Sequence, residues 1–146
     1  MEKSYKFKHI ENNLLKLLDV IVNHQPILKY IYYLDDDPLS HSDVEVDLIE
    51  SGHIVLSPFD PNILNQSMVK VFLNPFEGDL NLMPLSDITF LLDIVVPAKK
   101  WLLHGLGQIR AFRIADELAQ LIDGQMVAGI GECKITRFKL FKVNNE

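Results

Sequence analysis

The apolar segment 87–97, "DITFLLDIVVP", constrains the fold more than any other stretch of the chain. Its run of large apolar residues predicts a buried strand at the centre of a sheet. Pro97 ends the strand, because proline has no N–H to donate to a ladder. Asp93 interrupts the run, which is also too short to span a bilayer. The chain therefore has to build a sheet around this segment and cover it.

The residues after the strand predict that cover. "KKWLLHGLG", 99–107, indicates a wide turn, and residues 111–123 repeat apolar side chains at helical spacing. Gly124 stands just past the predicted helix, where a left-handed residue is needed as a cap. A strand–turn–helix unit of this kind needs no catalyst to explain it. The predicted apolar face of the helix consists of Phe112, Ala115, Leu118, Ala119 and Ile122, widened by Ile114 and Leu121.

The remaining segments complete an α+β pattern. Residues 10–23 carry a helical stripe, and "PILKYIYYL" is either a second helix that begins at Pro26 or a strand. Short strands are predicted at 44–50, 53–59, 68–73, 126–131 and 135–143. Gly129 and Gly131 suggest a bulge or a close approach between strands. We therefore expect one domain, 1–146, with a mostly antiparallel sheet flanked by an N-terminal helix and a second helix near residues 111–123.

Length and composition agree with this expectation. A chain of 146 residues, 48% hydrophobic and 23% charged, is long enough to bury a core as one domain. A net charge of −6 argues against binding nucleic acid by broad charge neutralisation. The single cysteine, Cys133, excludes an internal disulfide and fits a reducing compartment. Met1 is followed by "EKSYKFKH", which does not resemble a secretory signal.

The charges are distributed unevenly. From Asp35 to Val69 there are eight acidic residues and no Lys or Arg. Basic residues gather near both ends, at Lys3, Lys6 and Lys8 and at Lys134, Arg137, Lys139 and Lys142. Two interpretations stay open. In the first, the charged residues lie on solvated loops and strand faces. In the second, the chain has an acidic side and a basic side that are suited to stacking or ring closure.

The sequence offers little for catalysis or metal binding. No two histidines have the i, i+4 spacing of a helical zinc site, and one cysteine cannot form a thiolate cluster. The segment from Asp35 fails as a calcium loop, because Ser40 stands where glycine is needed and Val46 where a bidentate Glu is needed. His104, in "LLHGLG", is the best single catalytic candidate. We predict no catalytic residue, no metal site and no cofactor.

The second half of the chain resembles a known family. "DIVVP" with a Trp shortly after it, then "IRAFRIADELAQLIDG" and "GIGECKITRFKLFKV", resemble the tail terminator (tail-completion) proteins of tailed bacteriophages. The resemblance covers about residues 68–143, and the helix at 10–23 agrees with the family's layout. The acidic segment 35–50 has no counterpart in that pattern.

The resemblance implies a structural protein of the virion. Such proteins form a ring, usually of six subunits, at the head-proximal end of the tail tube. The ring ends tube polymerisation and then docks to the head connector. The implied partners are other copies of the chain, the tail tube protein and the connector or neck protein, with no membrane and no cofactor. DNA passes through the lumen in transit, and assembly takes place in the host cytoplasm.

Charge suggests residues for these roles. An acidic lumen would let DNA slide, since like charges disfavour contact. Arg110 and Arg113 either pair with carboxylates at a subunit boundary or tie the turn within one subunit. Arg137 and Lys139 are further interface candidates on the basic strand. The lumen candidates are Asp35, Asp36, Asp37, Asp43, Glu45, Asp47 and Glu50.

Other functions stay open beside this one. A different head–tail joining protein of the neck would use the same ring principle one layer away. A small acidic regulatory or inhibitory protein, also phage-encoded, would bind a host protein through the acidic segment. An enzyme built around His104 is the third class.

Overall fold

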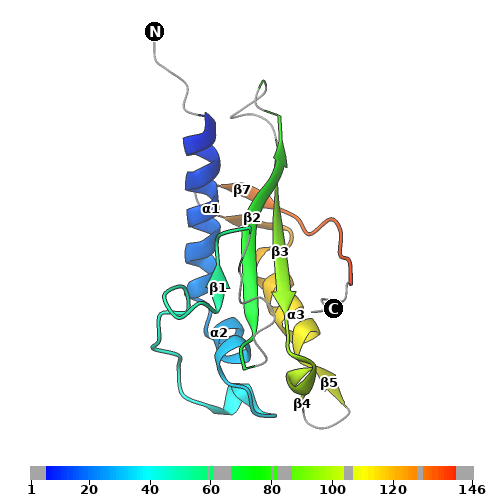
Figure 1. The fold of residues 1–146 in the computed structure, drawn as a ribbon. Helices are drawn as coiled ribbons and strands as arrows, with labels where there is room; N and C mark the ends of the chain where they lie inside the picture. The colour runs from blue at the N-terminus through cyan, green and yellow to red at the C-terminus, as the bar shows by residue number, and fades with distance from the viewer. Residues whose placement is uncertain are drawn as a thin grey trace.

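The sheet and its covering helices are the frame of the molecule (Figure 1). The computed structural model describes residues 6–58, 60, 67–79, 81, 87–103, 107–127 and 130–140. The fold class is α+β, as the sequence predicts. In chain order the elements are α1 Lys6–Val22, α2 Gln25–Tyr32, η1 Pro38–Ser40, β1 Ile54–Val55, β2 Lys70–Gly78, β3 Ile88–Val95, η2 Ala98–Lys100, β4 Leu102–Leu103, β5 Gln108–Ile109, α3 Arg110–Ile122, β6 Gln125–Val127 and β7 Gly131–Cys133.

The main sheet has the order β1-β2-β3. β1 is parallel to β2, and β2 is antiparallel to β3. The prediction that residues 87–97 form the central strand is wrong: β2 lies in the middle and β3 at the edge. The first four residues of β2 are buried, whereas β3 is half-buried and exposes Leu91. A run of apolar residues predicts that the side chains on the two faces of a strand are buried. It does not predict whether the strand is paired along one edge or along both.

β2 is also longer than predicted. We expected the strand to end before "NPFEG", but it continues through Pro75 to Gly78 and pairs there with β3. The register shifts between Pro75 and Glu77, and a bulge of this kind accommodates a proline that cannot donate to the ladder. The far end of the β2–β3 pair is exposed and extends beyond the core as an arm (Figure 1).

Helices α1 and α3 supply the cover. The predicted stripe of α1 is confirmed, with Leu17, Leu18 and Ile21 buried in the core. The predicted apolar face of α3 is confirmed at Ile114, Leu118 and Ile122, which are buried, and it shifts toward Ala111. Phe112, predicted to be buried, is largely exposed, and its ring lies edge-on to Trp101 at 6.2 Å. The helix turns this way because Arg110 has to point inward, as described below.

Two ambiguous segments are settled by burial. Residues 25–32 are the helix α2 rather than a strand, and Pro26 lies in its first turn as predicted. Residues 44–50 are not the predicted strand. Val44 and Leu48 are buried four apart, and the Asp47 carboxylate accepts hydrogen bonds from the N–H groups of Ile49 and Glu50. A side chain that bonds to its own local backbone stabilises a turn in place of a ladder.

The C-terminal region also departs from the prediction. β6 and β7 form a hairpin, but residues 134–140 are exposed and have no regular structure, and residues 141–143 lie outside the described residues. Gly124 has the predicted left-handed conformation, with a φ of +68°. The C-cap of α3 is Asp123, whose N–H donates to the Ala119 carbonyl, while the Gly124 N–H donates to the Cys133 carbonyl of the hairpin at 2.8 Å. Gly131 has a φ of +115° at the start of β7, and Gly129 lies outside the described residues.

Among the residues that the structure describes, none of the helices has the length and apolar composition of a membrane span.

Candidate functional site

The turn before α3 is organised around a buried arginine. Arg110 is only 1% exposed, although it carries a full charge at the first position of α3. Its Nη1 donates to the carbonyl oxygens of Tyr30 and Tyr33, both at 2.8 Å. Its Nη2 donates to the Asp35 carbonyl at 2.8 Å, and its Nε donates to the Lys100 carbonyl at 3.0 Å. One guanidinium therefore joins α2, the start of the acidic segment and the turn before α3.

This arginine caps α2. The last carbonyls of a helix have no partner within the helix, and a cation there also interacts favourably with the helix dipole. Burial lowers the pKa of Arg110, and the nearby carboxylates of Asp35 and Asp36 raise it. Part of the acidic segment thus compensates a buried positive charge. Sequence reasoning missed this role, although a predicted helix at 26–34 with no glycine after it is a signal that another group must cap it.

The four basic interface candidates do not form one cluster. Arg110 faces the interior and bonds within its own chain, so its assignment to a subunit boundary is wrong and the alternative, a tie within one subunit, holds. Arg113 is half-buried on α3. Arg137 and Lys139 are exposed on residues 134–140, which we call the basic tail. Arg113, Arg137 and Lys139 stay candidates for an interface.

The seven acidic lumen candidates are all exposed. Several of them also have local structural roles. The Asp35 carboxylate pairs with His41, whose ring stacks on Tyr33 at 4.2 Å, and Asp43 pairs with Lys29 at 3.4 Å. These contacts hold the segment against α2 instead of leaving it as a free loop.

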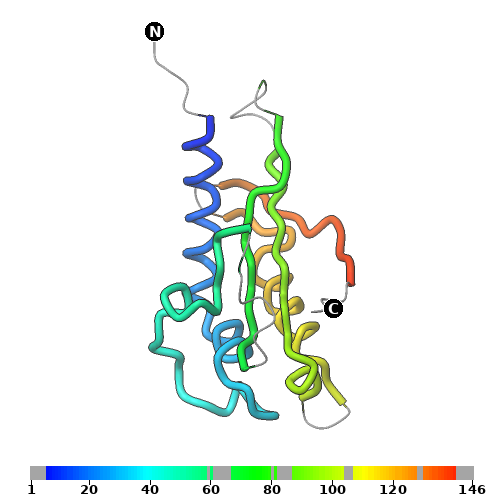
Figure 2. The backbone as a smooth tube through the Cα atoms, viewed as in Figure 1, coloured from blue at the N-terminus to red at the C-terminus, as the bar shows by residue number. Residues whose placement is uncertain are grey.

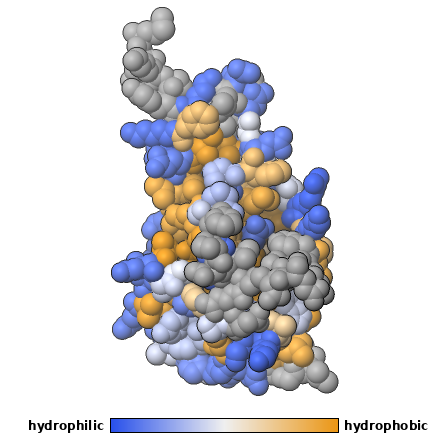
Figure 3. All heavy atoms as spheres, in the orientation of Figure 1, coloured by the Kyte–Doolittle hydropathy of each residue, from blue (hydrophilic) through white to orange (hydrophobic). Residues whose placement is uncertain are grey.

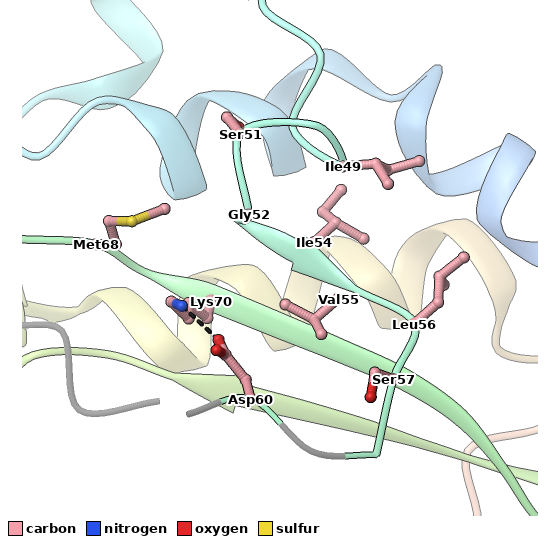
Figure 4. A pocket seen from close by; sticks show the side chains of 10 residues that line it. All are labelled: Ile49, Ser51, Gly52, Ile54, Val55, Leu56, Ser57, Asp60, Met68 and Lys70. Carbon is pink, nitrogen blue, oxygen red and sulfur yellow. Dashed lines mark hydrogen bonds and ion pairs between the residues drawn. The ribbon is translucent and has the colours of Figure 1, made fainter. Parts of the chain in front are cut away.

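A pocket of about 430 Å³ opens beside β1 and the start of β2 (Figure 4). Lys70 and Asp60 point toward one another there and form an ion pair, with side chains 5% and 12% exposed. A buried ammonium and a buried carboxylate need each other, because either charge alone would be costly in this environment. The lining residues are Ile49, Ser51, Gly52, Ile54, Val55, Leu56, Ser57, Asp60, Met68 and Lys70.

A second polar pair lies at the same wall. The Ser51 hydroxyl and His53 Nδ1 are 2.7 Å apart. Burial lowers the pKa of His53, and the charge of Lys70 lowers it further, so both favour the neutral imidazole. Ser51 and His53 are close in the chain, but only the parallel pairing of β1 with β2 brings them near Lys70, and no local pattern predicts that pairing.

His104 and Cys133 are the remaining residues that the sequence analysis considered for chemistry. His104, the best catalytic candidate in the sequence, lies outside the described residues. Cys133 is half-buried in β7, and burial raises the pKa of its thiol. Within the described ranges, no group of three or more His, Cys, Asp or Glu residues is placed to hold a metal ion.

Two exposed features of the described surface are the edge of β3 and the basic tail. In the part of the chain that the structure describes, β3 is paired with β2 alone. The basic tail exposes Phe138 by 81% and Leu140 by 64%. Figure 2 traces this tail, in orange to red, on the side of the molecule away from α1, and Figure 3 shows hydrophobic residues along α1 and on the β2–β3 arm.

The comparisons with known proteins give one match. No curated protein and no solved structure matches the chain. The sequence model of the YomW family matches residues 24–146, which begins just before α2 and leaves α1 outside. This family is phage-derived, in agreement with the phage origin that the resemblance implies. The chain belongs to the YomW family and is a phage-associated protein.

Proposed function

We propose that the chain is a structural protein of the phage particle that forms a ring, of six subunits, at the head-proximal end of the tail tube. The ring ends tube polymerisation and joins the tail to the head connector. Its partners are other copies of the chain, the tail tube protein and a connector or neck protein. It works in the virion after assembly in the host cytoplasm, and it catalyses no reaction.

Two findings support this proposal. The chain belongs to a phage-derived family over residues 24–146. Its α+β architecture, with α1 near the N-terminus and α3 after the β2–β3 pair, agrees with the layout that the tail terminator resemblance implies.

The observation that carries the proposal is the exposure of the basic tail. Phe138 is 81% exposed beside Arg137 and Lys139, and a chain that worked alone would gain nothing from this arrangement. Large aromatic side chains and arginines are enriched in protein interfaces, where they are buried by the partner. The same chain carries acidic residues elsewhere on its surface, so identical copies have complementary charges to offer one another.

The acidic segment supplies the second part of the function. Its seven exposed carboxylates, from Asp35 to Glu50, would line the lumen of the ring and repel the phosphates of passing DNA. Because Asp35 and Asp43 are paired with His41 and Lys29, the segment keeps a defined position and does not fill the channel.

The test is assembly. Light scattering of the purified chain, alone and with tail tubes, should give a mass several times 16.7 kDa, and electron microscopy should show rings or capped tubes. Arg113→Glu should weaken assembly, whereas Lys16→Glu, on the exposed side of α1, serves as the control charge reversal. A chain that stays monomeric with tail tubes present and leaves their length unchanged would remove the proposal.

The exposed acidic segment favours a second candidate. A small phage regulator could use these carboxylates to bind a basic surface of a host protein. Such a chain should remain monomeric and bind its partner in a strongly salt-dependent way. If the chain is instead another head–tail joining protein of the neck, its rings should bind the connector and should not cap tail tubes.

A further inference from the structure

The outer edge of β3 is open to another strand. Because β3 pairs with β2 alone in the described chain, every second residue directs its backbone N–H and C=O groups away from the sheet. Natural edge strands usually prevent further pairing with lysine or proline. Ile88–Val95 contains neither, and Asp93 is its one charged residue. This edge is therefore suited to accept an extended segment.

The two faces of β3 differ. Leu92 lies opposite Leu73 and Ile94 opposite Val71, so these side chains pack on the core, yet both are only half-buried at the edge. Leu91 and Asp93 lie on the other face, where Leu91 is exposed and Asp93 is half-buried opposite the buried Phe72. A strand that fits here needs apolar side chains on the core face and polar or basic side chains on the face of Leu91 and Asp93.

The basic tail has this pattern. In an extended segment, successive side chains point to opposite faces. Phe138 and Leu140 then share one face, and Arg137 and Lys139 share the other. Placed along β3, the two apolar side chains would continue the core face and the two cations would lie on the face of Asp93.

The charges of the two segments are opposite. From Val71 to Ala98 the chain has four acidic residues and no Lys or Arg. From Lys134 to Leu140 it has three basic residues and no acidic one. Complementary charge raises the rate of encounter and fixes the partner. The acidic residues of the β2–β3 pair and its end are Glu77, Asp79, Asp87 and Asp93.

We propose that the basic tail of one copy adds as a strand to the β3 edge of a neighbouring copy. This inference rests on the proposed ring function and names the contact that closes the ring. The Ile135 N–H is bound to the Asp123 carboxylate at 2.8 Å, so the start of the tail is fixed at the end of α3 while its apolar side chains stay uncovered. Tail and edge are different surfaces, and a contact between two different surfaces builds a ring when the rotation from copy to copy closes.

Charge exchange tests the pairing. R137E/K139E and E77K/D87K, made separately, should each weaken self-association by about tenfold or more, because like charges then face one another. The variant that combines all four changes should recover association. E11K/D19K, which reverses two exposed acidic residues of α1, is the matched control and should associate as the unchanged chain does. Sedimentation velocity at two salt concentrations measures all four.

Cross-linking separates neighbouring copies from a single chain. In a Cys133→Ser background, a tagged Leu91→Cys copy mixed with an untagged Lys139→Cys copy should cross-link across copies. A chain with both cysteines that cross-links only within itself would overturn the inference, as would rings that survive R137E/K139E unchanged. Either result would contradict the strand pairing and leave the proposed ring function untouched. The ring function itself would be contradicted if the unchanged chain formed no oligomer with tail tubes.

Discussion

The Nη1 atom of Arg110 lies 2.8 Å from the carbonyl oxygen of Tyr30, a residue eighty positions earlier in the chain. This contact ties the first turn of α3 to the end of α2. It also explains why α3 buries Ile114 and leaves Phe112 largely exposed: an inward Arg110 fixes the rotation of the helix. The strand-to-helix turn is thus held by a buried cation.

Arg110→Lys should destabilise the fold by at least about 2 kcal/mol, since a lysine ammonium cannot reach four carbonyls in the fork geometry of a guanidinium and leaves buried acceptors unpaired. Urea unfolding followed by Trp101 fluorescence measures the change. Arg113→Lys, on the same helix but half-buried, should stay within about 0.5 kcal/mol. Equal stability of the two variants would contradict the capping role.

The ion pair in the pocket should behave as a buried pair. Lys70→Met or Asp60→Asn alone should cost about 3–5 kcal/mol, because each leaves an uncompensated buried group. The double variant Lys70→Met/Asp60→Asn should cost clearly less than the sum of the two. The exposed pair Lys134–Glu132, at 3.8 Å, is the comparison and should contribute no more than about 1 kcal/mol. Additive losses at Lys70 and Asp60 would show that the two side chains do not interact.

His53 should make stability depend on pH. Its pKa is lowered in the folded protein by burial and by Lys70, so below the ordinary value of 6.5 the unfolded chain binds a proton that the folded chain does not. Stability should therefore fall as the pH falls from 7 to 5. His53→Phe keeps a ring next to Tyr32 and removes this titration, so its loss over the same range should be smaller. Urea midpoints at pH 7, 6 and 5 measure the difference, and parallel curves would exclude His53 as the cause.

Gly124→Ala should destabilise the fold by about 1 kcal/mol, because a φ of +68° disfavours any residue with a Cβ. No heavy atom lies within 4 Å of the added Cβ, so the cost comes from the backbone alone. Gly124→Asn should cost less, since asparagine tolerates this conformation. Gly107→Ala is the control, because its added Cβ is equally open and its φ is not in the left-handed region; it should be neutral or slightly stabilising. Thermal unfolding of the three variants decides the point.

Local patterns predicted α1 and α3, but they left α2 open between helix and strand. The stripe of α1, the first-turn position of Pro26 and the left-handed conformation of Gly124 follow from spacing and backbone preferences, which depend only on neighbours in the chain. The phage origin also came from the sequence, through residues 68–143, and the family match over 24–146 agrees with it.

Contacts between distant segments decided the rest. The edge position of β3 depends on where β1 pairs, and the burial of Arg110 depends on carbonyls of α2, neither of which leaves a local pattern. Residues 44–50 alternate like a strand, yet they form a turn because Asp47 bonds to its own backbone and Leu48 finds the core. A sequence records what each residue prefers, but pairing partners are chosen only when the whole chain has folded.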